Sequence, residues 1–151
     1  MEKEDTIDFH IRWAWGRIAK LYDREAAKYG GTMATGYVLI TIDPENGTPS
    51  TKLGPKMGME PRSLTRILTN LEGRGLIERK PDEKDKRKVN ICLTKEGHNS
   101  RKISRDTVIC FNEKLQGQLS KKEVEQFFRT MTKINNILDT EEIFENEEID
   151  Q

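Results

Sequence analysis

Hydrophobic residues near the start of the chain recur at intervals of three and four, the spacing that places side chains on one face of a helix. This stripe consists of Ile7, Ile11, Trp15, Ile18 and Tyr22. It predicts a helix over residues 7–29, which the glycine pair at positions 30 and 31 would end. A second, almost wholly apolar helix is expected over about residues 33–42, with Thr32 as its N-cap.

Two short helices are expected after a turn-forming cluster at residues 43–47. The first covers about residues 51–57. It contains Pro55, which would clash with the carbonyl of Thr51 and is tolerable only if the helix begins close to residue 52 or 53. The second begins at Pro61, because proline is favoured at the first helical position. Its apolar face consists of Leu64, Ile67, Leu68 and Leu71.

The pattern changes to a period of two after Gly75. Residues 76–79 are a short strand candidate, residues 81–86 form a charged turn, and alternation over residues 89–93 predicts a half-buried strand. Together they predict a β-hairpin with a long charged tip. Two more helices follow: Thr94 caps one that runs to about residue 115 or 116, and a capping box starts the last at Ser120.

The charge of the chain is unevenly distributed. Its 151 residues carry 26 basic and 26 acidic side chains, so the net charge is zero. Residues 50–105 nevertheless hold 15 Lys/Arg and 7 Asp/Glu, a net +8, while residues 1–49 carry −2 and residues 106–151 carry −6. Chance scatter over a solvated surface is the alternative, but the imbalance favours a basic functional face.

Two short helices followed by a basic hairpin give the element order of a winged helix-turn-helix. In that arrangement the second helix offers polar side chains to the major groove of DNA, and the wing reaches phosphates or the minor groove. The alternative is an ordinary amphipathic helix with a solvated face. The candidate DNA-binding residues are Arg62, Ser63, Thr65, Arg66, Thr69 and Asn70 on the helix, with Lys84, Lys86, Arg87 and Lys88 on the wing.

The same segment resembles the MarR (multiple antibiotic resistance regulator) family. The resemblance rests on three motifs in register: the helix followed by G-L-I-x-R, a D-x-R wing, and an L-T-x-x-G junction into the next helix. In this chain they are residues 58–79, 82–87 and 93–97. The likeness is closest over about residues 50–98. Gly54-Pro55 departs from the family pattern of alanine and an unconstrained residue, and Lys86 replaces a frequent arginine.

The resemblance implies a homodimeric transcription regulator, commonly a repressor, with interlocked terminal helices. It also implies that Arg87 enters the minor groove, while Asp85 helps to hold the wing. The fold class expected is therefore mainly α with a small β-hairpin wing, a winged helix-turn-helix domain plus N- and C-terminal dimerisation helices. The domains are residues 1–32, an N-terminal dimerisation helix; 33–98, the DNA-binding domain; 99–140, C-terminal dimerisation helices; and 141–151, an acidic flexible tail.

A dimer is also indicated by composition. Only 34% of the residues are apolar, so a single subunit offers a small core and a twin could supply further burial. Packing within one chain is the alternative. A two-fold dimer would set two recognition helices about 34 Å apart and read a palindromic operator in double-stranded DNA. The interface candidates are Trp15, Phe127, Phe128, Ile134 and Leu138, with Trp13 beside them.

Family members often release DNA when a small, commonly aromatic or phenolic effector binds, so an aromatic or other apolar effector is expected. The pocket candidates are His10, Trp13, Trp15 and Tyr37. The favoured alternative is that the aromatic side chains belong to the core or the dimer interface and that His10 is a surface or hydrogen-bonded histidine. Some relatives sense peroxides through a cysteine in the first helix, which has none here. Cys92 and Cys110 are expected to be structural, and a thiol redox-responsive regulator is a further alternative.

No phosphate-binding loop, nucleophile elbow or zinc-type Cys/His spacing is present. We therefore expect no enzyme activity, no cofactor and no metal site. The charged N-terminus and the lack of an apolar run of about 18 residues predict a cytoplasmic protein without membrane association. The function expected is a DNA-binding transcriptional regulator, ligand-responsive and most often a repressor in such families. The alternative is a winged-helix protein-interaction module without DNA binding.

Overall fold

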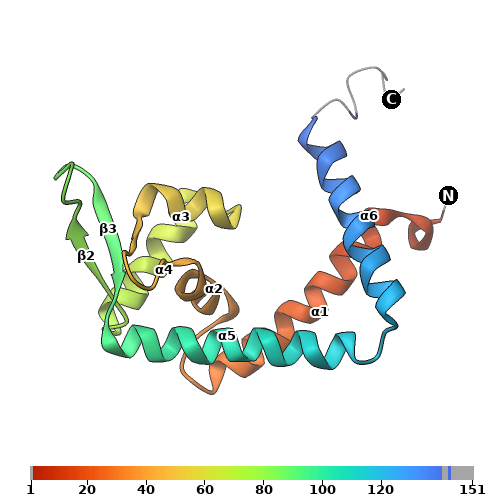
Figure 1. Ribbon diagram of the computed structural model, residues 1–151, viewed down its shortest axis with the longest axis horizontal. Coiled ribbons are helices and arrows are strands. Elements are labelled where there is room, and N and C mark those ends of the chain that lie inside the picture. Colours follow the sequence, from red (N-terminus) through yellow and green to blue (C-terminus); the bar gives the residue numbers. More distant parts are fainter. Residues whose placement is uncertain (1, 141–142, 144–151) are drawn as a thin grey trace. The chain divides into compact units, whose positions relative to one another are not determined.

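The computed structural model describes residues 2–140 and 143, which contain helices and one small sheet (Figure 1). The chain forms two compact units, residues 1–108 and 109–151, with the boundary inside α5. The tail predicted at residues 141–151 lies outside the described residues except for Ile143. The elements are η1 (Lys3–Asp5), α1 (Ile7–Ala27), α2 (Met33–Thr41), β1 (Thr48–Pro49), α3 (Ser50–Met57), α4 (Pro61–Gly73), β2 (Ile77–Pro81), β3 (Val89–Leu93), α5 (Lys95–Gln116) and α6 (Lys121–Asp139).

The first two helices lie close to their predicted ranges. α1 ends at Ala27, and Gly30 follows with φ 74°, a left-handed conformation that glycine adopts without strain. The N-terminus of α2 is closed by a capping box between Thr32 and Thr35, and the Met33 amide donates to the Asp23 carboxylate at 2.7 Å. The bond from Met33 to Asp23 links the start of α2 to α1.

α3 lies within one residue of its predicted range, but it does not begin close to residue 52 or 53, where Pro55 would avoid a clash. The helix begins at Ser50 and contains Pro55 at its sixth position. The proline leaves the carbonyl of Thr51 without its helical partner, and Thr51 is exposed, so water can solvate that carbonyl. Gly54 is buried, and a Cβ there would lie 3.1 Å from the Met59 carbonyl oxygen, which explains why the usual alanine is absent.

The predicted hairpin is present, but it belongs to a three-stranded antiparallel sheet of order β1-β3-β2. β2 pairs with β3 so that Ile77 lies opposite Leu93 and Arg79 opposite Ile91. The third strand, β1, was not predicted. It pairs Thr48 with Ile91, and its two residues follow the turn at residues 43–47.

The hydrophobic core lies entirely within the segment from α2 to β3. Its buried side chains are Val38, Leu39, Ile42, Leu53, Leu64, Leu68, Leu71, Leu76, Ile77, Ile91 and Leu93. α5 begins directly beside this core, where the Thr94 hydroxyl accepts the Gly97 amide at 3.0 Å. A Cβ at Gly97 would overlap the Leu76 carbonyl oxygen, so glycine is required at this junction.

The second unit contains the end of α5 and all of α6. A capping box starts α6, as predicted: the Ser120 hydroxyl accepts the Glu123 amide, and the Glu123 carboxylate accepts the Ser120 amide at 2.7 Å. The backbone amide of Ser120 and then its hydroxyl donate to the Glu123 carboxylate and hold the pKa of Glu123 below its ordinary value. α6 buries none of its residues. No helix in the part of the chain that the structure describes is long and apolar enough to span a membrane.

Candidate nucleic-acid interface

α4 turns its apolar face to the core and its polar face to solvent. Leu64, Leu68 and Leu71 are at most 5% exposed. Because they share one face, the polar positions between them must point outward. The six predicted DNA-binding positions of this helix are all exposed: Arg62, Ser63, Thr65, Arg66, Thr69 and Asn70.

Some side chains of this polar face already form hydrogen bonds within the protein, and others do not. The hydroxyls of Thr65 and Thr69 donate to carbonyls one turn earlier, each at 2.9 Å, so they retain lone pairs but have used their proton. Arg62 and Arg66 have no carboxylate within 4.0 Å among the described residues. Two unneutralised guanidinium groups one turn apart therefore face solvent.

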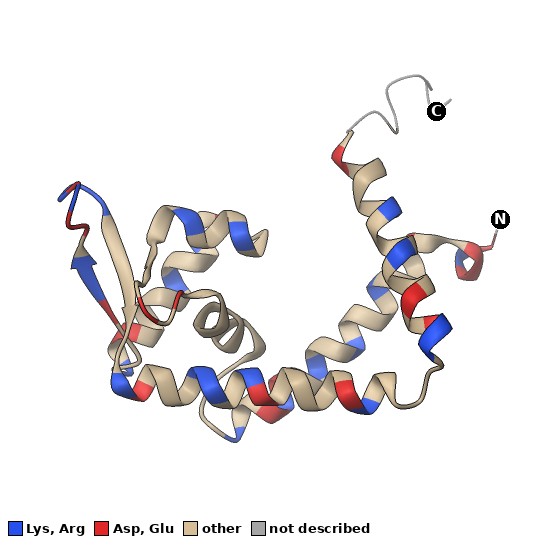
Figure 2. Cartoon of the chain, in the orientation of Figure 1, with Lys and Arg blue, Asp and Glu red and all other residues tan. Residues whose placement is uncertain are grey.

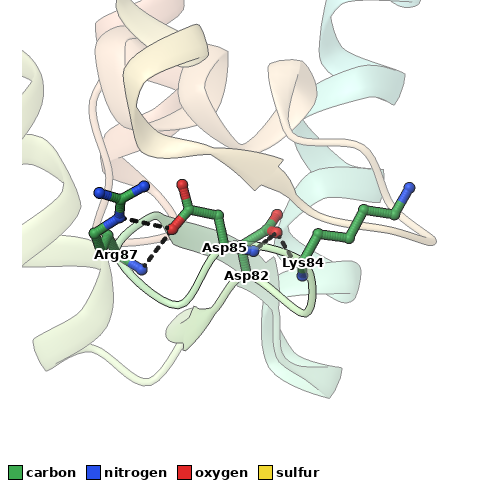
Figure 3. A network of polar contacts seen from close by, with 4 residues as sticks. All are labelled: Asp82, Lys84, Asp85 and Arg87. Atoms are coloured by element: carbon green, nitrogen blue, oxygen red, sulfur yellow. Dashed lines mark hydrogen bonds and ion pairs between the residues drawn. The ribbon is translucent and has the colours of Figure 1, made fainter.

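The wing between β2 and β3 is shaped by Asp82 (Figure 3). One oxygen of its carboxylate accepts the amides of Lys84 and Asp85, both at 2.9 Å. The Asp82 amide donates to the Lys88 carbonyl, which closes the base of the turn. Backbone hydrogen bonds from Asp85 and then Lys84 hold the pKa of Asp82 below its ordinary value.

Asp85 and Arg87 form an ion pair at the tip of this turn. Asp85 Oδ1 accepts both the backbone amide and Nε of Arg87, each at 3.1 Å (Figure 3). The Arg87 side chain is 92% exposed and that of Asp85 is 31% exposed. The carboxylate thus limits the rotation of the arginine, while the outer guanidinium nitrogens face solvent. Lys84, Lys86 and Lys88 are exposed beside it.

Basic side chains of the winged segment divide into paired and unpaired groups. Arg79 lies 3.3 Å from Glu72 and Lys80 lies 3.0 Å from Glu78, so these two cations are balanced by neighbouring acids. Glu78 also raises the pKa of Lys80. Figure 2 shows Lys and Arg along the wing and on α3 and α4, whereas α2 carries no charged residue. Within the winged segment, Lys and Arg side chains that have no ion pair therefore lie on α3, on α4 and on the wing, where Arg87 is the one paired with an acid.

A cavity of about 530 Å³ lies within the first unit, between α1, α2 and α5. Two of the predicted effector-binding side chains, Trp15 and Tyr37, line it, together with Tyr22 and Tyr29. His10 and Trp13 are not among the lining residues. The His10 ring bonds to the Glu4 carbonyl through Nε2 at 2.6 Å, which places it at the start of α1.

The predicted dimer-interface residues are mostly exposed. Trp15 is 55% exposed in the first unit, and in the second unit Phe127, Phe128 and Leu138 are 58%, 54% and 55% exposed. Ile134 is half-buried. The side chains of α6 therefore present an apolar face that its own unit does not cover.

Cys92 is half-buried on β3 and Cys110 is exposed on α5, and both are free thiols. The Asn90 side chain donates to Cys92 Sγ at 3.7 Å. Within residues 2–140 and 143, no group of three or more His, Cys, Asp or Glu side chains is placed to hold a metal ion.

The sequence analysis did not predict the roles of two residues in this unit. Asp82 was seen only as part of a motif, although an aspartate at the start of a turn commonly accepts amides two and three residues on. Arg74, which follows α4 as its C-cap, lines the cavity, and no sequence signal marks it, because the cavity forms between helices distant in the chain.

Comparison with known protein families and sequences agrees with this geometry. The sequence profile of the MarR family matches residues 32–89. The HTH-type transcriptional regulator SarZ of Staphylococcus epidermidis is 32% identical over 90 residues, which are 59% of this chain and 60% of that protein. The matching segment thus spans about 60% of the length of this curated relative.

Solved structures extend the likeness beyond the winged helix. MepR of Staphylococcus aureus, in complex with DNA, superimposes with a TM-score of 0.82 at 24% identity, over 88% of this chain and 98% of that one. CouR of Rhodococcus jostii RHA1, bound to p-coumaroyl-CoA, gives a TM-score of 0.78 at 22% identity, over 89% and 94%. These likenesses show that the fold, including the terminal helices, is that of winged helix regulators.

Proposed function

We propose that this chain is a regulator of the MarR family type: a homodimeric, sequence-specific DNA-binding transcriptional regulator. The observation that carries the proposal is the polar face of α4, with the unpaired guanidinium groups of Arg62 and Arg66, followed by a basic wing. SarZ is named as a transcriptional regulator, and the MepR structure is of a DNA complex. The proposal assigns no catalytic role to any residue.

In this proposal α4 enters the major groove. Arginine at positions 62 and 66 can bind guanine bidentately, while Ser63 and Asn70 read base edges or hold phosphates. Thr65 and Thr69 contribute as acceptors, because their protons are used within the helix. α4 contributes base preference, and the wing contributes affinity.

The wing contacts the backbone and the adjacent minor groove. Arg87 is the residue that enters the groove, because its side chain is 92% exposed and Asp85 holds its Nε in place. Narrow minor grooves carry enhanced negative potential that attracts an inserted arginine. Lys84, Lys86 and Lys88 then neutralise flanking phosphates.

Dimerisation follows from the apolar faces of α1 and α6. The large apolar side chains of Trp15 and Phe127 are more than half exposed. Packing against a second copy of the chain would remove this apolar surface from water. A two-fold dimer presents two α4 helices to successive major grooves, so the operator is palindromic. Occupation of an operator excludes other proteins from the same DNA, which makes repression the mode of regulation that we propose.

Control by a small molecule is the remaining part of the proposal. The cavity beside α1 and α2 is large enough for an apolar effector, and Trp15 and Tyr37 line it. The CouR structure holds p-coumaroyl-CoA. An effector releases the operator only if it binds more tightly to a conformation that fits DNA poorly.

The test is binding to duplexes selected from a random genomic library, measured at several salt concentrations. Selection of a palindromic site, with affinity that falls steeply as salt rises, is the expected result. Arg87→Ala is expected to weaken binding to all duplexes. Lys80→Ala is the matched control, because it removes one positive charge from β2 and not from the tip of the wing. Absence of duplex binding even at low salt would instead favour a protein-interaction module.

A further inference from the structure

The wing has three strands at its base and two strands beyond it. β1 pairs with β3 at two positions, and the one nearer the wing tip joins Pro49 to Asn90. β2 and β3 stay paired as far as Pro81 and Val89, and from there they lead to the tip (Figure 1). Because a hairpin of two strands is only marginally stable by itself, its base decides how firmly the tip is held. Asn90 lies at that base, at the last position that the third strand supports.

The backbone of β1 offers one donor fewer at this position. Proline has no amide hydrogen, so Pro49 cannot donate to the strand ladder. The side chain of Asn90 forms a bond of its own: Nδ2 donates to the Asn46 carbonyl at 2.7 Å, although the two residues are 44 positions apart. Asn46 belongs to the turn at residues 43–47, which leads into β1 and α3. This bond therefore joins the strand of the wing to the segment that begins the helix-turn-helix.

The turn also packs closely on β3. Gly47 has a φ of 70°, a left-handed conformation that favours glycine. A Cβ at this position would lie 2.6 Å from the Ile91 carbonyl oxygen, 2.7 Å from Cys92 Sγ and 2.8 Å from Asn90 Nδ2. All three distances are too short for a side chain. The glycine thus allows the turn to approach β3 closely enough for Asn90 to reach the Asn46 carbonyl.

The acceptor of this bond is held in place by hydrogen bonds within the turn. Asp43 Oδ1 accepts the amides of Glu45 and Asn46 at 2.9 and 2.8 Å. The Asp43 amide donates to the Thr48 hydroxyl at 2.9 Å, and the Asp43 carbonyl accepts the Gly47 amide at 3.0 Å. Backbone hydrogen bonds from Asn46 and then Glu45 hold the pKa of Asp43 below its ordinary value. The turn is therefore a fixed point to which the wing strand can be fastened.

We propose that Asn90 is a positioning residue, which fastens the wing to the turn at residues 43–47 and thereby sets where Arg87 lies relative to α4. Ile91, the neighbour of Asn90 on β3, belongs to the same hydrophobic core as Leu53 of α3 and Leu64 of α4. The core thus fixes the inner face of β3, and the bond of Asn90 fixes its outer side. Together they limit how far the tip can swing.

A fixed wing matters for binding because ordering a mobile segment costs free energy. A guanidinium that already stands at the minor groove when α4 enters the major groove loses less conformational freedom on binding. The bond should therefore favour duplex affinity through Arg87, with no contact between Asn90 and DNA. This consequence rests on the function proposed above, whereas the fastening of the wing does not.

The first test contains no DNA and follows the mobility of the wing tip. Nitrogen-15 relaxation gives order parameters for the backbone amides of residues 83–88 in the full chain. In Asn90→Ala they should fall from values near those of rigid backbone, about 0.85, towards the flexible range below about 0.6. The order parameters of α4 should stay unchanged, because Leu64, Leu68 and Leu71 keep this helix in the core.

Two further variants control this measurement. Asn46→Ala is the matched control, because the acceptor is a backbone carbonyl that this substitution keeps, and the tip should stay rigid. Asn90→Asp keeps the shape of the side chain but has no N–H donor, so it should loosen the tip and is the second variant if Asn90→Ala does not fold. A tip that is equally rigid in both Asn90 variants, or equally mobile in Asn46→Ala, would overturn the proposal.

The second test separates positioning from general stabilisation by a double-mutant cycle with Arg87. On the selected duplex at constant salt, Asn90→Ala should weaken binding about threefold to tenfold when Arg87 is present. In the Arg87→Ala protein the same substitution should weaken binding less than about twofold, because no wing arginine remains to be positioned. An equal loss in both proteins, or no loss in either, would contradict the positioning of Arg87 by Asn90.

The two tests also distinguish this proposal from the function on which its consequence rests. Absence of duplex binding by the unaltered chain would contradict the regulator function alone, because the relaxation measurement contains no DNA. Normal duplex binding with an unchanged wing tip in Asn90→Ala would contradict the positioning role alone.

Discussion

The segment from α2 to β3 and the helices that flank it bury their apolar residues to very different degrees. In the part of the chain that the structure describes, all eleven buried apolar side chains lie between Val38 and Leu93. α1 and α6 bury none of their residues, although they carry both tryptophans and the Phe127–Phe128 pair, whose rings lie 5.6 Å apart. The winged helix thus completes a core from its own side chains, whereas the apolar faces of the flanking helices are available to a second copy.

Because of this difference, the contribution of each region to the free energy of unfolding should depend differently on protein concentration. A core closed within one chain unfolds with a free energy that dilution does not change. Apolar faces that are covered by a twin contribute only while the dimer persists, so their contribution follows mass action. Substitutions in the two regions should therefore separate in experiments at two protein concentrations.

The largest expected effect is on the core of the winged helix. Leu71 on α4 is fully buried, and Leu71→Ala should lower the free energy of unfolding by about 2–5 kcal/mol, because it removes apolar contacts and leaves a cavity. Urea unfolding followed by circular dichroism measures this loss, which should be the same at low and high protein concentration. Leu21→Ala is the control, since Leu21 is 50% exposed and its loss should cost less than about 1 kcal/mol.

The next effect concerns the flanking helices. Phe127 is 58% exposed on α6, and Phe127→Ala should weaken the dimer by at least about tenfold, because aromatic anchors dominate such interfaces. Sedimentation equilibrium measures the dissociation constant. The helical content should stay unchanged, and Gln126→Ala should leave the dimer intact. A Phe127→Ala protein that dimerises as before would remove α6 from the interface.

The sequence was most informative where one face of an element is buried by its neighbours. The ranges of α2 and α4, the strand β3 and the capping box at Ser120 were all predicted closely, since apolar spacing and capping residues are local signals. The structure also explains the glycine of one sequence motif, Gly97. The glycine of L-T-x-x-G is needed because a Cβ would overlap the Leu76 carbonyl.

Features that depend on contacts between distant segments could not be predicted. β1 has only two residues and exists because Thr48 pairs with Ile91. The start of α3 was misjudged, because local sterics at Pro55 do not reveal that the exposed Thr51 carbonyl can be solvated. The role of Arg74 at the cavity requires the packing of α1 against α2, which no local pattern records.

Within the winged helix, the two groups of basic residues should separate by their effect on DNA. Arg66 on α4 has no acidic partner among the described residues, and Arg66→Ala should cost about 1–3 kcal/mol of binding to the best duplex and relax base preference at one position. Lys80→Ala should change affinity much less, because Glu78 lies 3.0 Å away. Fluorescence anisotropy with a set of single-base operator variants distinguishes the two. Equal effects of both substitutions would mean that net charge alone governs binding.

The smallest effect should come from the turn that shapes the wing. Asp82→Ala removes the acceptor of the Lys84 and Asp85 amides, so Arg87 loses its fixed position and duplex affinity should fall on the order of threefold to tenfold. Asp82→Asn keeps an acceptor oxygen and should restore most of the affinity.

The pH dependence of the hydrogen bonds to Asp82 tests whether its ionised carboxylate holds the turn. The pKa of Asp82 is held below its ordinary value, so its contribution is fully present above the pKa of the unfolded chain, about 3.9, and is lost as the pH falls through the lower folded value. Amide resonances of Lys84 and Asp85 should therefore stay unchanged from pH 8 to pH 5 and shift only in more acidic solution. A shift of these two resonances near neutral pH would show that Asp82 does not hold the turn as the carboxylate that the structure shows.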